Sequence, residues 1–456
     1  MKVYDTIAAI STPRGKGGIA VIRISGEECV AILKRVFVPC GKDPVEYARR
    51  ACFGHIVGPD GDVIDEGLVT YFATPHSFTG ENVAEISCHG GVLLTETVLG
   101  AVLAAGARPA TAGEFTARAM LNGKMGLASA EALGALLEAG TKGQMLLARG
   151  GMEGKLADAT SALYERLTAI LSDIYAKVDF PDEDLNSMSE QELRAALLEV
   201  RERTAALAAT WHTGRAVSDG VRTVICGPVN AGKSTLYNAI VGRDAAIVTD
   251  IAGTTRDIIS ETAALGQVTL HLSDTAGLRD TEDAVEKIGV ARADAAIDEA
   301  ELVLLVLDGS KAPDGGTRAL IERLKRVQGT VVAVLNKEDR GGDFPSEVLA
   351  DFAHVVKISA KTGDISPLSS LVERLYTDET LDIRNDAVVA NARQFAALVR
   401  AAEALDAAIA ALDAGIPLDA SCVEAELALS AFGEVDGRAV GEDIVANIFS
   451  RFCVGK

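Results

Sequence analysis

A glycine-rich segment near the middle of the chain has the residue types and spacing needed to hold phosphate groups. Residues 227–234 match the pattern G-x-x-x-x-G-K-[ST] and lie between a predicted strand, VRTVIC, and a predicted helix. The glycines let backbone N–H groups turn towards the phosphates, where the start of the helix adds its positive dipole end. In such a loop Lys233 neutralises the β- and γ-phosphates and the Ser234 hydroxyl binds Mg²⁺.

Three further motifs follow in a fixed order. Residues 274–277 (DTAG) follow the predicted strand VTLHLS, where a carboxylate holds magnesium through water and a glycine N–H senses the γ-phosphate. Residues 336–339 (NKED) end the strand TVVAVL, where a carboxylate accepts from guanine N1–H and N2–H₂, which adenine lacks. Residues 359–361 (SAK) end VVKI and supply a backbone donor to guanine O6. Together the four motifs predict a site for GTP rather than ATP.

The loop at residues 249–257 (TDIAGTTRD) is rich in oxygen ligands. A threonine there can complete the Mg²⁺ shell only when a γ-phosphate is bound, which makes the loop a switch, and two threonines compete on sequence alone. The predicted GTP-binding residues are Asn230, Ala231, Gly232, Lys233, Ser234, Thr235, Thr249, Asp250, Ile251, Ala252, Gly253, Thr254, Thr255, Asp274, Thr275, Ala276, Gly277, Asn336, Lys337, Asp339, Ser359, Ala360 and Lys361.

The residue that orients the attacking water is not evident from these motifs. Leu278 occupies the position at which Ras-like proteins carry a glutamine, and leucine cannot polarise water. The nearby carboxylates are Asp280, Glu282, Asp283 and Glu286, each of which is also typical of a solvated helix start. Charge that develops on the phosphoryl group needs a cation as well, and Asn230 with the oxygen-rich loop can hold a monovalent ion.

The elements around these motifs indicate a multidomain α+β and α/β protein. The first 120 residues or so alternate strand and helix signals, which predicts an α+β domain at 1–119. Helical spacing of Ala, Leu, Glu and Arg predicts an all-α domain made of 120–215 and 380–456. It is interrupted by an inserted Ras-like P-loop domain, 216–379, with alternating strands and helices.

Composition narrows the class of protein further. The length of 456 residues suggests about three domains. A net charge of −21 argues against a protein that simply coats nucleic acid. The chain has neither a membrane-length apolar run nor a signal-peptide core, so we expect a soluble cytoplasmic protein with no membrane association. Seven cysteines without a CxxC pair are expected to be reduced and buried, except Cys453.

The motifs DIAGTTRD, DTAGLR followed by VEKIG, and the C-terminal CVGK together resemble the family of the tRNA modification GTPase MnmE (TrmE). The N-terminal segments DTIAAISTPRGKGGIAVIRISG, PHSFTGEN, EISCHGG, GEFTARAMLNGK and AEAL resemble it too. The likeness covers essentially the whole chain and its domain order. It implies that the N-terminal domain has a folate-binding-like fold and mediates homodimerisation. Its ligand would be 5-formyl- or 5,10-methylene-tetrahydrofolate, with contacts on Arg23, Glu81, Lys124 and Lys456.

The resemblance also implies roles in catalysis. Potassium ligands fall on Asn230, Thr249, Ile251 and Thr254, Thr255 completes the Mg²⁺ shell beside Ser234, and Glu286 positions the catalytic water. The P-loop reads GPVN where the family usually has G-R-P-N, while the residues that hold the phosphates match the family. Cys453 matches the family's C-[ILV]-G-K cysteine, which modification needs as nucleophile or positioning residue. Catalytic roles are therefore expected for Glu286, Lys233 and Cys453.

The family acts with an FAD-dependent partner of the GidA/MnmG type on C5 of the wobble uridine of tRNA. The alternative is a ribosome-assembly GTPase of the Era or Der type, which shares a GTTRD-like switch. Residues 15–18 (GKGG) match the GXXG of an RNA-binding KH module, but that loop joins two helices, whereas here it lies between predicted strands. A folate enzyme with a vestigial nucleotide domain and a purely structural scaffold are both disfavoured by the intact P-loop.

Overall fold

The computed structural model describes residues 5–179, 187–242, 260–273, 295–342, 344–438, 445, 448–450, 452, 454 and 455. The chain divides into two compact units, one of Met1–Gly134 with Asp436–Lys456 and the other of Ala135–Val435. The three predicted domains are a finer division, which stays a prediction. No helix in the described ranges is both long and apolar enough to cross a membrane.

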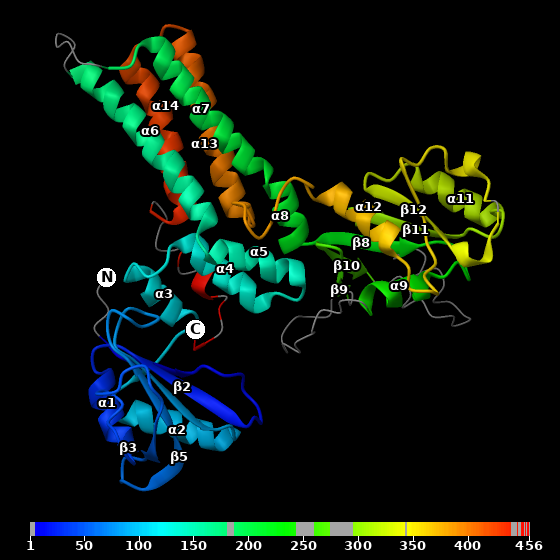
Figure 1. Ribbon diagram of the computed structural model, residues 1–456. Helices are drawn as coiled ribbons and strands as arrows, with labels where there is room; N and C mark the ends of the chain where they lie inside the picture. Colours follow the sequence, from blue (N-terminus) through cyan, green and yellow to red (C-terminus); the bar gives the residue numbers. More distant parts are fainter. Residues whose placement is uncertain are drawn as a thin grey trace. The chain divides into compact units, whose positions relative to one another are not determined.

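The first unit is built on a seven-stranded sheet, counted over the described residues (Figure 1). Its strand order is β3-β4-β5-β6-β2-β1-β7, with antiparallel neighbours except for the parallel pair β1 and β7. The strands are β1 (Ile7–Ile10), β2 (Ile19–Ser25), β3 (Phe37–Pro39), β4 (Cys52–Val57), β5 (Val63–Phe72), β6 (Val83–His89) and β7 (Arg108–Pro109).

Helices α1 (Cys29–Val36) and α2 (Val92–Ala104) cover one face of this sheet. Alternate residues of β2, Ile22 and Ile24 among them, pack in one core with side chains of both helices. The intervening residue Arg23 therefore points to the opposite face, since successive strand residues alternate between faces. That face carries the candidate site described below.

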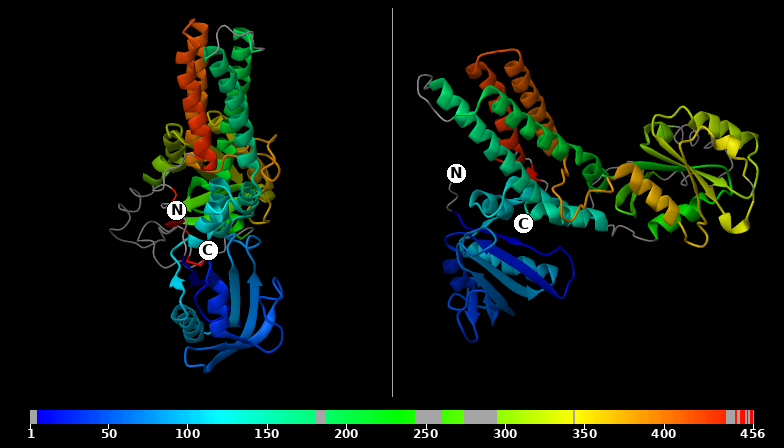
Figure 2. Two further views of the ribbon diagram at one scale, coloured as in Figure 1. Left: turned by 90° about the vertical axis from the view of Figure 1, so that its left-hand side faces the viewer. Right: turned by 45° about the horizontal axis from the view of Figure 1, so that its top comes forward.

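Helices make up much of the remaining chain. They are α3 (Glu114–Leu121), α4 (Leu127–Glu138), α5 (Lys142–Met152), α6 (Lys155–Asp179), α7 (Glu190–Ala209), α8 (Trp211–Ser218), α13 (Ala392–Asp413) and α14 (Leu418–Asp436). Helices α6, α7, α13 and α14 run side by side and share one core of aliphatic side chains (Figure 2). Capping boxes at Thr141 and Ser189 define the starts of α5 and α7.

The second unit also contains a six-stranded sheet within the described residues, in the order β13-β12-β11-β8-β10-β9. All neighbours are parallel except β10 and β9. Its elements are β8 (Val221–Cys226), α9 (Lys233–Val241), β9 (Ser260–Leu265), β10 (Val268–Ser273), β11 (Leu302–Asp308), α11 (Gly315–Leu324), β12 (Thr330–Asn336), β13 (His354–Lys357) and α12 (Ser366–Tyr376), with 3₁₀ turns at Glu338–Arg340 and Ser346–Leu349.

The apolar strand β11 shows why this sheet is buried on both sides. Leu302, Leu304 and Val306 face one core, which contains α9 and α12. The alternate residues, such as Val303 and Leu305, face a second core, which contains α11. Helices on both faces of a mostly parallel sheet confirm the predicted α/β architecture.

The predicted helices and strands agree with the structure, whereas one prediction about cysteine burial does not. The loop at residues 15–18 joins β1 and β2, two strands, as expected, and so lacks the helical flanks of a KH module. Among the described cysteines, Cys29, Cys52, Cys88, Cys226 and Cys422 are buried, but Cys40 is exposed. Cys40 follows β3, which lies at the edge of the sheet formed by the described strands, and its side chain is exposed, so the expectation that it is buried was wrong.

Candidate functional site

The glycine-rich loop connects the carboxyl end of β8 to the start of α9. Its two glycines are required by backbone geometry, since Gly227 has a φ of 142° and Gly232 a φ of 102°. A Cβ at Gly227 would lie 2.1 Å from the Val306 carbonyl oxygen, and one at Gly232 would lie 2.2 Å from Asn336 Nδ2. Gly232 occupies the N-cap of α9 without a side-chain cap. The first N–H groups of the helix are thus directed at the place where phosphates would bind.

Lys233 lies folded over this loop. Its Nζ donates to the carbonyl oxygens of Gly227 at 3.0 Å and Pro228 at 2.9 Å. Burial lowers the pKa of Lys233, because desolvation disfavours the charged ammonium. Ser234 and Thr235 are on the first turn of α9, and the loop residue Ala231 is buried. The ammonium is therefore placed to exchange loop carbonyls for phosphate oxygens.

The buried residue Asn336 joins three of the predicted motifs. It ends β12, and its Nδ2 donates to the Ala231 carbonyl oxygen of the P-loop at 2.9 Å. Its Oδ1 accepts from the Ala360 backbone N–H at 2.9 Å. Ser359 links the motif at residues 359–361 to the NKED motif, because its hydroxyl donates to Asp339 Oδ1 at 2.8 Å. Phosphate loop and base-recognition loops thus form one hydrogen-bonded assembly.

Lys337 adds a second link between the same loops. Its Nζ donates to the Asn230 carbonyl oxygen and to Asp308 Oδ2, both at 2.6 Å. Lys337 and Asn230 both have left-handed backbones, with φ of 69° and 62°. Non-glycine residues adopt this conformation at a cost, which is often found where a ligand is held. The exposed Lys361 follows Ala360 at the rim.

Asp308 is a site residue that the sequence analysis missed. It ends β11 and pairs in register with Asn336 at the end of β12. Burial alone would raise the pKa of Asp308, but hydrogen bonds from Lys337 and Ser310 outweigh it and lower the value to about 2. The sequence signal that could have identified Asp308 is a carboxylate at the end of the apolar strand LVLLVLD. The carboxyl ends of parallel strands meet at one edge of the sheet, where ligands bind.

Many predicted residues lie outside the described residues and keep only their predicted roles. In the nucleotide site they are Thr249, Asp250, Ile251, Ala252, Gly253, Thr254, Thr255, Asp274, Thr275, Ala276, Gly277 and Glu286. Cys453 and Lys456 of the C-terminal tail lie outside as well. Within the described part of the chain, no cluster of three or more His, Cys, Asp or Glu side chains has the arrangement to hold a metal ion.

A second group of polar residues gathers in the first unit, on the sheet face opposite α1 and α2. Arg23 donates from Nε and Nη2 to Glu85 Oε1, at 3.0 and 2.8 Å. Its guanidinium carbon lies 5.6 Å from the ring centroid of Phe78 and 5.7 Å from that of Phe115. Such a cation between aromatic rings and one carboxylate is suited to hold a planar, anionic ligand.

The C-terminal tail reaches the same place. The carbonyl oxygen of Gly455 accepts from Ser11 Oγ at 3.1 Å and from Arg23 Nη1 at 3.5 Å. Val454 forms a bridge with Ala112. The tail residues next to Cys453 and Lys456 therefore lie beside Arg23, although they are far away in the sequence.

Glu81 is joined to this group through β2. Ser25, which shares a face with Arg23, donates from its hydroxyl to Glu81 Oε2 at 2.7 Å. Lys124 runs along Gly80, the residue before Glu81, and its Nζ donates to the Pro75 carbonyl oxygen at 3.0 Å. Arg23, Glu81 and Lys124, predicted from three separate segments, are thus brought into one neighbourhood.

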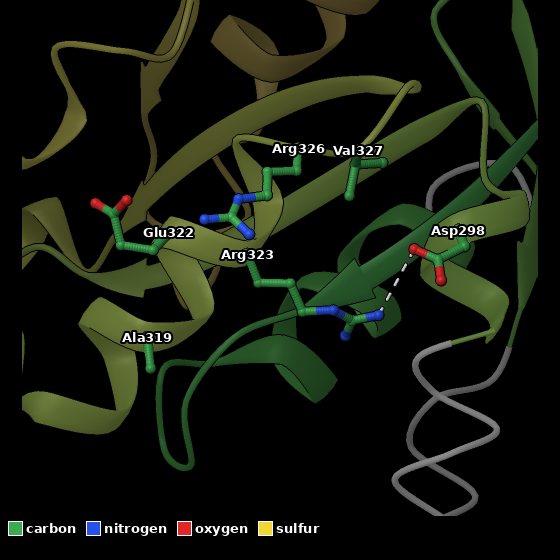
Figure 3. A pocket seen from close by; sticks show the side chains of 6 residues that line it. All are labelled: Asp298, Ala319, Glu322, Arg323, Arg326 and Val327. Atoms are coloured by element: carbon green, nitrogen blue, oxygen red, sulfur yellow. Dashed lines mark ion pairs between the residues drawn. The ribbon is translucent and has the colours of Figure 1, made fainter.

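A surface hollow of about 500 Å³ lies on the second unit (Figure 3). It is lined by Asp298, Ala319, Glu322, Arg323, Arg326 and Val327. Arg323 Nη2 and Asp298 Oδ1 form an ion pair at 3.6 Å across it. None of the lining residues belongs to the nucleotide motifs, so this hollow is distinct from the candidate site.

Comparison with known proteins covers the parts of the chain that contain both groups of residues. Residues 6–124 match the family model described as "GTP-binding protein TrmE N-terminus", and residues 127–453 match "MnmE helical domain". The chain is 40% identical over 459 residues to the tRNA modification GTPase MnmE of Symbiobacterium thermophilum, covering 99% of each chain. It is 39% identical to that of Heliobacterium modesticaldum, covering 100% of each chain. For that of Lactobacillus gasseri the identity is 37%, with 99% of this chain and 98% of the relative covered. With its P-loop assembly, its N-terminal polar group and this full-length similarity, the chain belongs to the MnmE family of tRNA modification GTPases.

Proposed function

We propose that this chain is a potassium-activated GTPase that modifies C5 of the wobble uridine of certain tRNAs together with an FAD-dependent partner of the GidA/MnmG family. The group added would be aminomethyl or carboxymethylaminomethyl, with glycine or ammonium as the source of the amine. We further propose that the chain works in the cytoplasm as a homodimer. The names of the relatives support tRNA as the substrate, and the likeness over whole chains supports a shared activity.

The observation that carries the GTPase part is the pair of hydrogen bonds made by Asn336. They join the phosphate-binding loop to the two loops proposed to read guanine. In this assembly Lys233 binds the β- and γ-phosphates, Asp339 accepts from guanine N1–H and N2–H₂, and the N–H of Ala360 donates to O6. Adenine has an acceptor at N1, a donor at C6 and no amino group at C2, so its binding leaves polar groups unpaired.

Fewer described residues support the proposed metal sites than support the nucleotide contacts. Ser234 at the start of α9 would hold Mg²⁺ together with Thr255, and bound Mg²⁺ would neutralise charge on the phosphates. Potassium would be held by Asn230, with Thr249, Ile251 and Thr254 of the switch loop. The left-handed backbone of Asn230, linked to Lys337, fits a residue held for such contacts.

The N-terminal polar group fits a reduced folate. Arg23 supplies a cation between Phe78 and Phe115, and the carboxylate of Glu81 suits the amino-amide edge of a pterin. Lys124 and Lys456 would bind the folate carboxylates. Bound 5-formyl- or 5,10-methylene-tetrahydrofolate would supply the one-carbon unit, and Cys453 would act near it as nucleophile or positioning residue.

GTP turnover by the purified chain in potassium and in sodium tests the proposal, beside a Glu286→Ala variant. Turnover is expected to be much faster in potassium. The variant is expected to lose at least about 10²-fold, because it removes the group that positions the catalytic water. Glu282→Ala is the matched control, since it removes a neighbouring carboxylate without that role. Equal rates in both salts would refute the potassium site, and a loss in Glu282→Ala alone would move the catalytic role to Glu282.

A further inference from the structure

Arg118 of α3 is a buried cation with three acidic neighbours. It is 2% exposed. Its Nη2 donates to Asp5 Oδ1 at 2.7 Å and to Glu114 Oε1 at 3.0 Å, and its Nη1 donates to the Asp5 carbonyl oxygen at 2.8 Å. Glu81 lies further away, with its two carboxylate oxygens 3.3 and 3.4 Å from Nη1. A guanidinium is buried at a large cost unless it is paired, so this arrangement is specific.

Two of the three acids are also paired with a second arginine. Arg108 donates from Nε to Asp5 Oδ2 at 2.6 Å and from Nη2 to Glu114 Oε1 at 2.6 Å. Arg108 has no such contact with Glu81 among the described residues. The cluster holds the three negative charges of Asp5, Glu81 and Glu114 against two positive charges. Because Asp5 and Glu114 are bonded twice and at shorter distances, the excess charge falls on Glu81.

Glu81 is nevertheless held in place. Its Oε2 accepts from Ser25 Oγ at 2.7 Å, and the Ser25 hydroxyl lies 2.7 Å from Thr79 Oγ1. Its side chain is 19% exposed, so it is not fully buried. Since Ser25 donates to Glu81 and shares its strand face with Arg23, Glu81 lies beside the Arg23 group.

Stability alone explains Arg118 poorly. Within the described residues its Nε is buried without a hydrogen-bond partner. An unsatisfied buried N–H is unfavourable, and a buried ion cluster is often less stabilising than an apolar replacement. A buried residue with this cost is typical of a site that trades stability for function.

We propose that Arg118 is a positioning residue that orients the Glu81 carboxylate towards a ligand with paired N–H donors, such as the amino-amide edge of a pterin. Arg118 itself does not touch the ligand. It acts through Glu81, while Arg108 balances Asp5 and Glu114. The inference rests on the folate role proposed for this site, and it adds Arg118 as the residue that orients the Glu81 carboxylate.

Arginine substitutions in the full-length chain test this inference, with calorimetric binding of 5-formyl-tetrahydrofolate as the readout. Arg118→Met is expected to weaken binding by at least about tenfold. The matched control is Arg108→Met, which removes ion pairs to the same Asp5 and Glu114 but leaves Glu81 untouched. It is expected to keep affinity within about twofold, since it acts away from the ligand. Equal losses in the two variants would overturn the inference.

A double-mutant cycle separates positioning from a general structural effect. If Arg118 acts through Glu81, adding Arg118→Met to Glu81→Gln causes no further loss of affinity, because the group it orients is already changed. Additive losses would refute the proposal. Thermal unfolding of each variant identifies loss of folding. Should Arg118→Met not fold, the conservative pair Arg118→Lys and Arg108→Lys replaces the comparison, since lysine keeps the charge but lacks the planar fork.

Two failures are distinguishable. If the unaltered chain does not bind 5-formyl-tetrahydrofolate, the folate proposal fails and this inference fails with it. If the unaltered chain binds and Arg118→Met binds equally well, only the positioning role of Arg118 is refuted.

Discussion

The nucleotide site and the N-terminal polar group are built in different ways. The nucleotide site lies at the end of a mostly parallel sheet. Its parts are short loops, each continuous in sequence, joined by hydrogen bonds of Asn336 and Lys337. The N-terminal group is assembled from single residues on β2, the turn before β6, α3 and the C-terminal tail. Loop motifs carry their chemistry locally, whereas the N-terminal group depends on the tertiary fold to exist at all.

The two also differ in how charge is used. In the nucleotide site Lys233 donates only to loop carbonyl oxygens and has no acidic partner among the described residues, and the start of α9 has no side-chain cap. Beside the N-terminal group, the buried Arg118 is already paired with Asp5 and Glu114. We therefore expect substitutions in the first site to change ligand choice, and substitutions in the second to change stability as well as affinity.

Exchange of Asp339 for asparagine should give the largest effect. The amide has one acceptor and presents an NH₂ where guanine has N–H donors, but it pairs with the C2 carbonyl of xanthine. The preference for GTP over XTP is expected to fall by about 10⁴-fold, since buried polar groups are left unpaired with the wrong base. Competition binding of the two nucleotides measures it.

In the Asp339→Asn variant the amide oxygen can still accept from the Ser359 hydroxyl, as the Asp339 carboxylate does, so the loop itself should keep its geometry. The control is Glu338→Gln, because Glu338 is an exposed carboxylate next to Asp339 in the same motif. An unchanged preference in Asp339→Asn would mean that base reading is not local to this loop, which would weaken the contrast between the sites.

Lowering the pH should weaken the ionic cluster of Asp5, Arg108, Glu114 and Arg118 in the first unit. Burial alone would raise the pKa of Glu114, but hydrogen bonds from Arg108, the Thr111 N–H and Arg118 lower it from 4.5 to about 2. The resulting stability is fully present above pH 4.5 and is lost as pH falls towards 2. It amounts to on the order of 3 kcal/mol.

Glu114→Gln should therefore destabilise α3 at pH 7 and make its stability less sensitive to acid between pH 4.5 and 2. Hydrogen exchange of peptides spanning α3, corrected for intrinsic rates, checks this at pH 7 and near the acid end. The exposed Glu96 on α2 serves as the control, as Glu96→Gln. Equal acid sensitivity of Glu114→Gln and the unaltered chain would show that the cluster does not stabilise the unit.

The smallest expected effect concerns the tail. Gly455 has a φ of 100°, and a Cβ there would lie 2.3 Å from the Ile10 carbonyl oxygen. Gly455→Ala should displace the tail from Ser11 and Arg23, and weaken 5-formyl-tetrahydrofolate binding by about tenfold. Titration calorimetry measures the change. Val454→Ala, which alters an exposed side chain one residue earlier, should bind normally. If both bind like the unaltered chain, the tail does not contribute to the site.

The sequence predicted the two sites unequally. Each nucleotide motif is a run of adjacent residues whose spacing reflects one loop, so Lys233, Asn336 and Asp339 were identified directly. Asp308 was missed because it is a single carboxylate at a strand end, and only the register of β11 with β12 places it beside Lys337. Arg118 was missed for a similar reason, since nothing in its local sequence marks it as buried among Asp5, Glu81 and Glu114.

By itself, the sequence determined the nucleotide chemistry, the order of helices and strands, and membership in the family. These depend on local patterns: loop spacing, apolar periodicity and motif order. Only the tertiary structure decided which further residues join each site, such as Asp308 beside Lys337 and Arg118 beside Glu81. The physical reason is that charge burial and pairing arise where separate elements pack together, and a single segment of chain contains no information about the charges that will surround it.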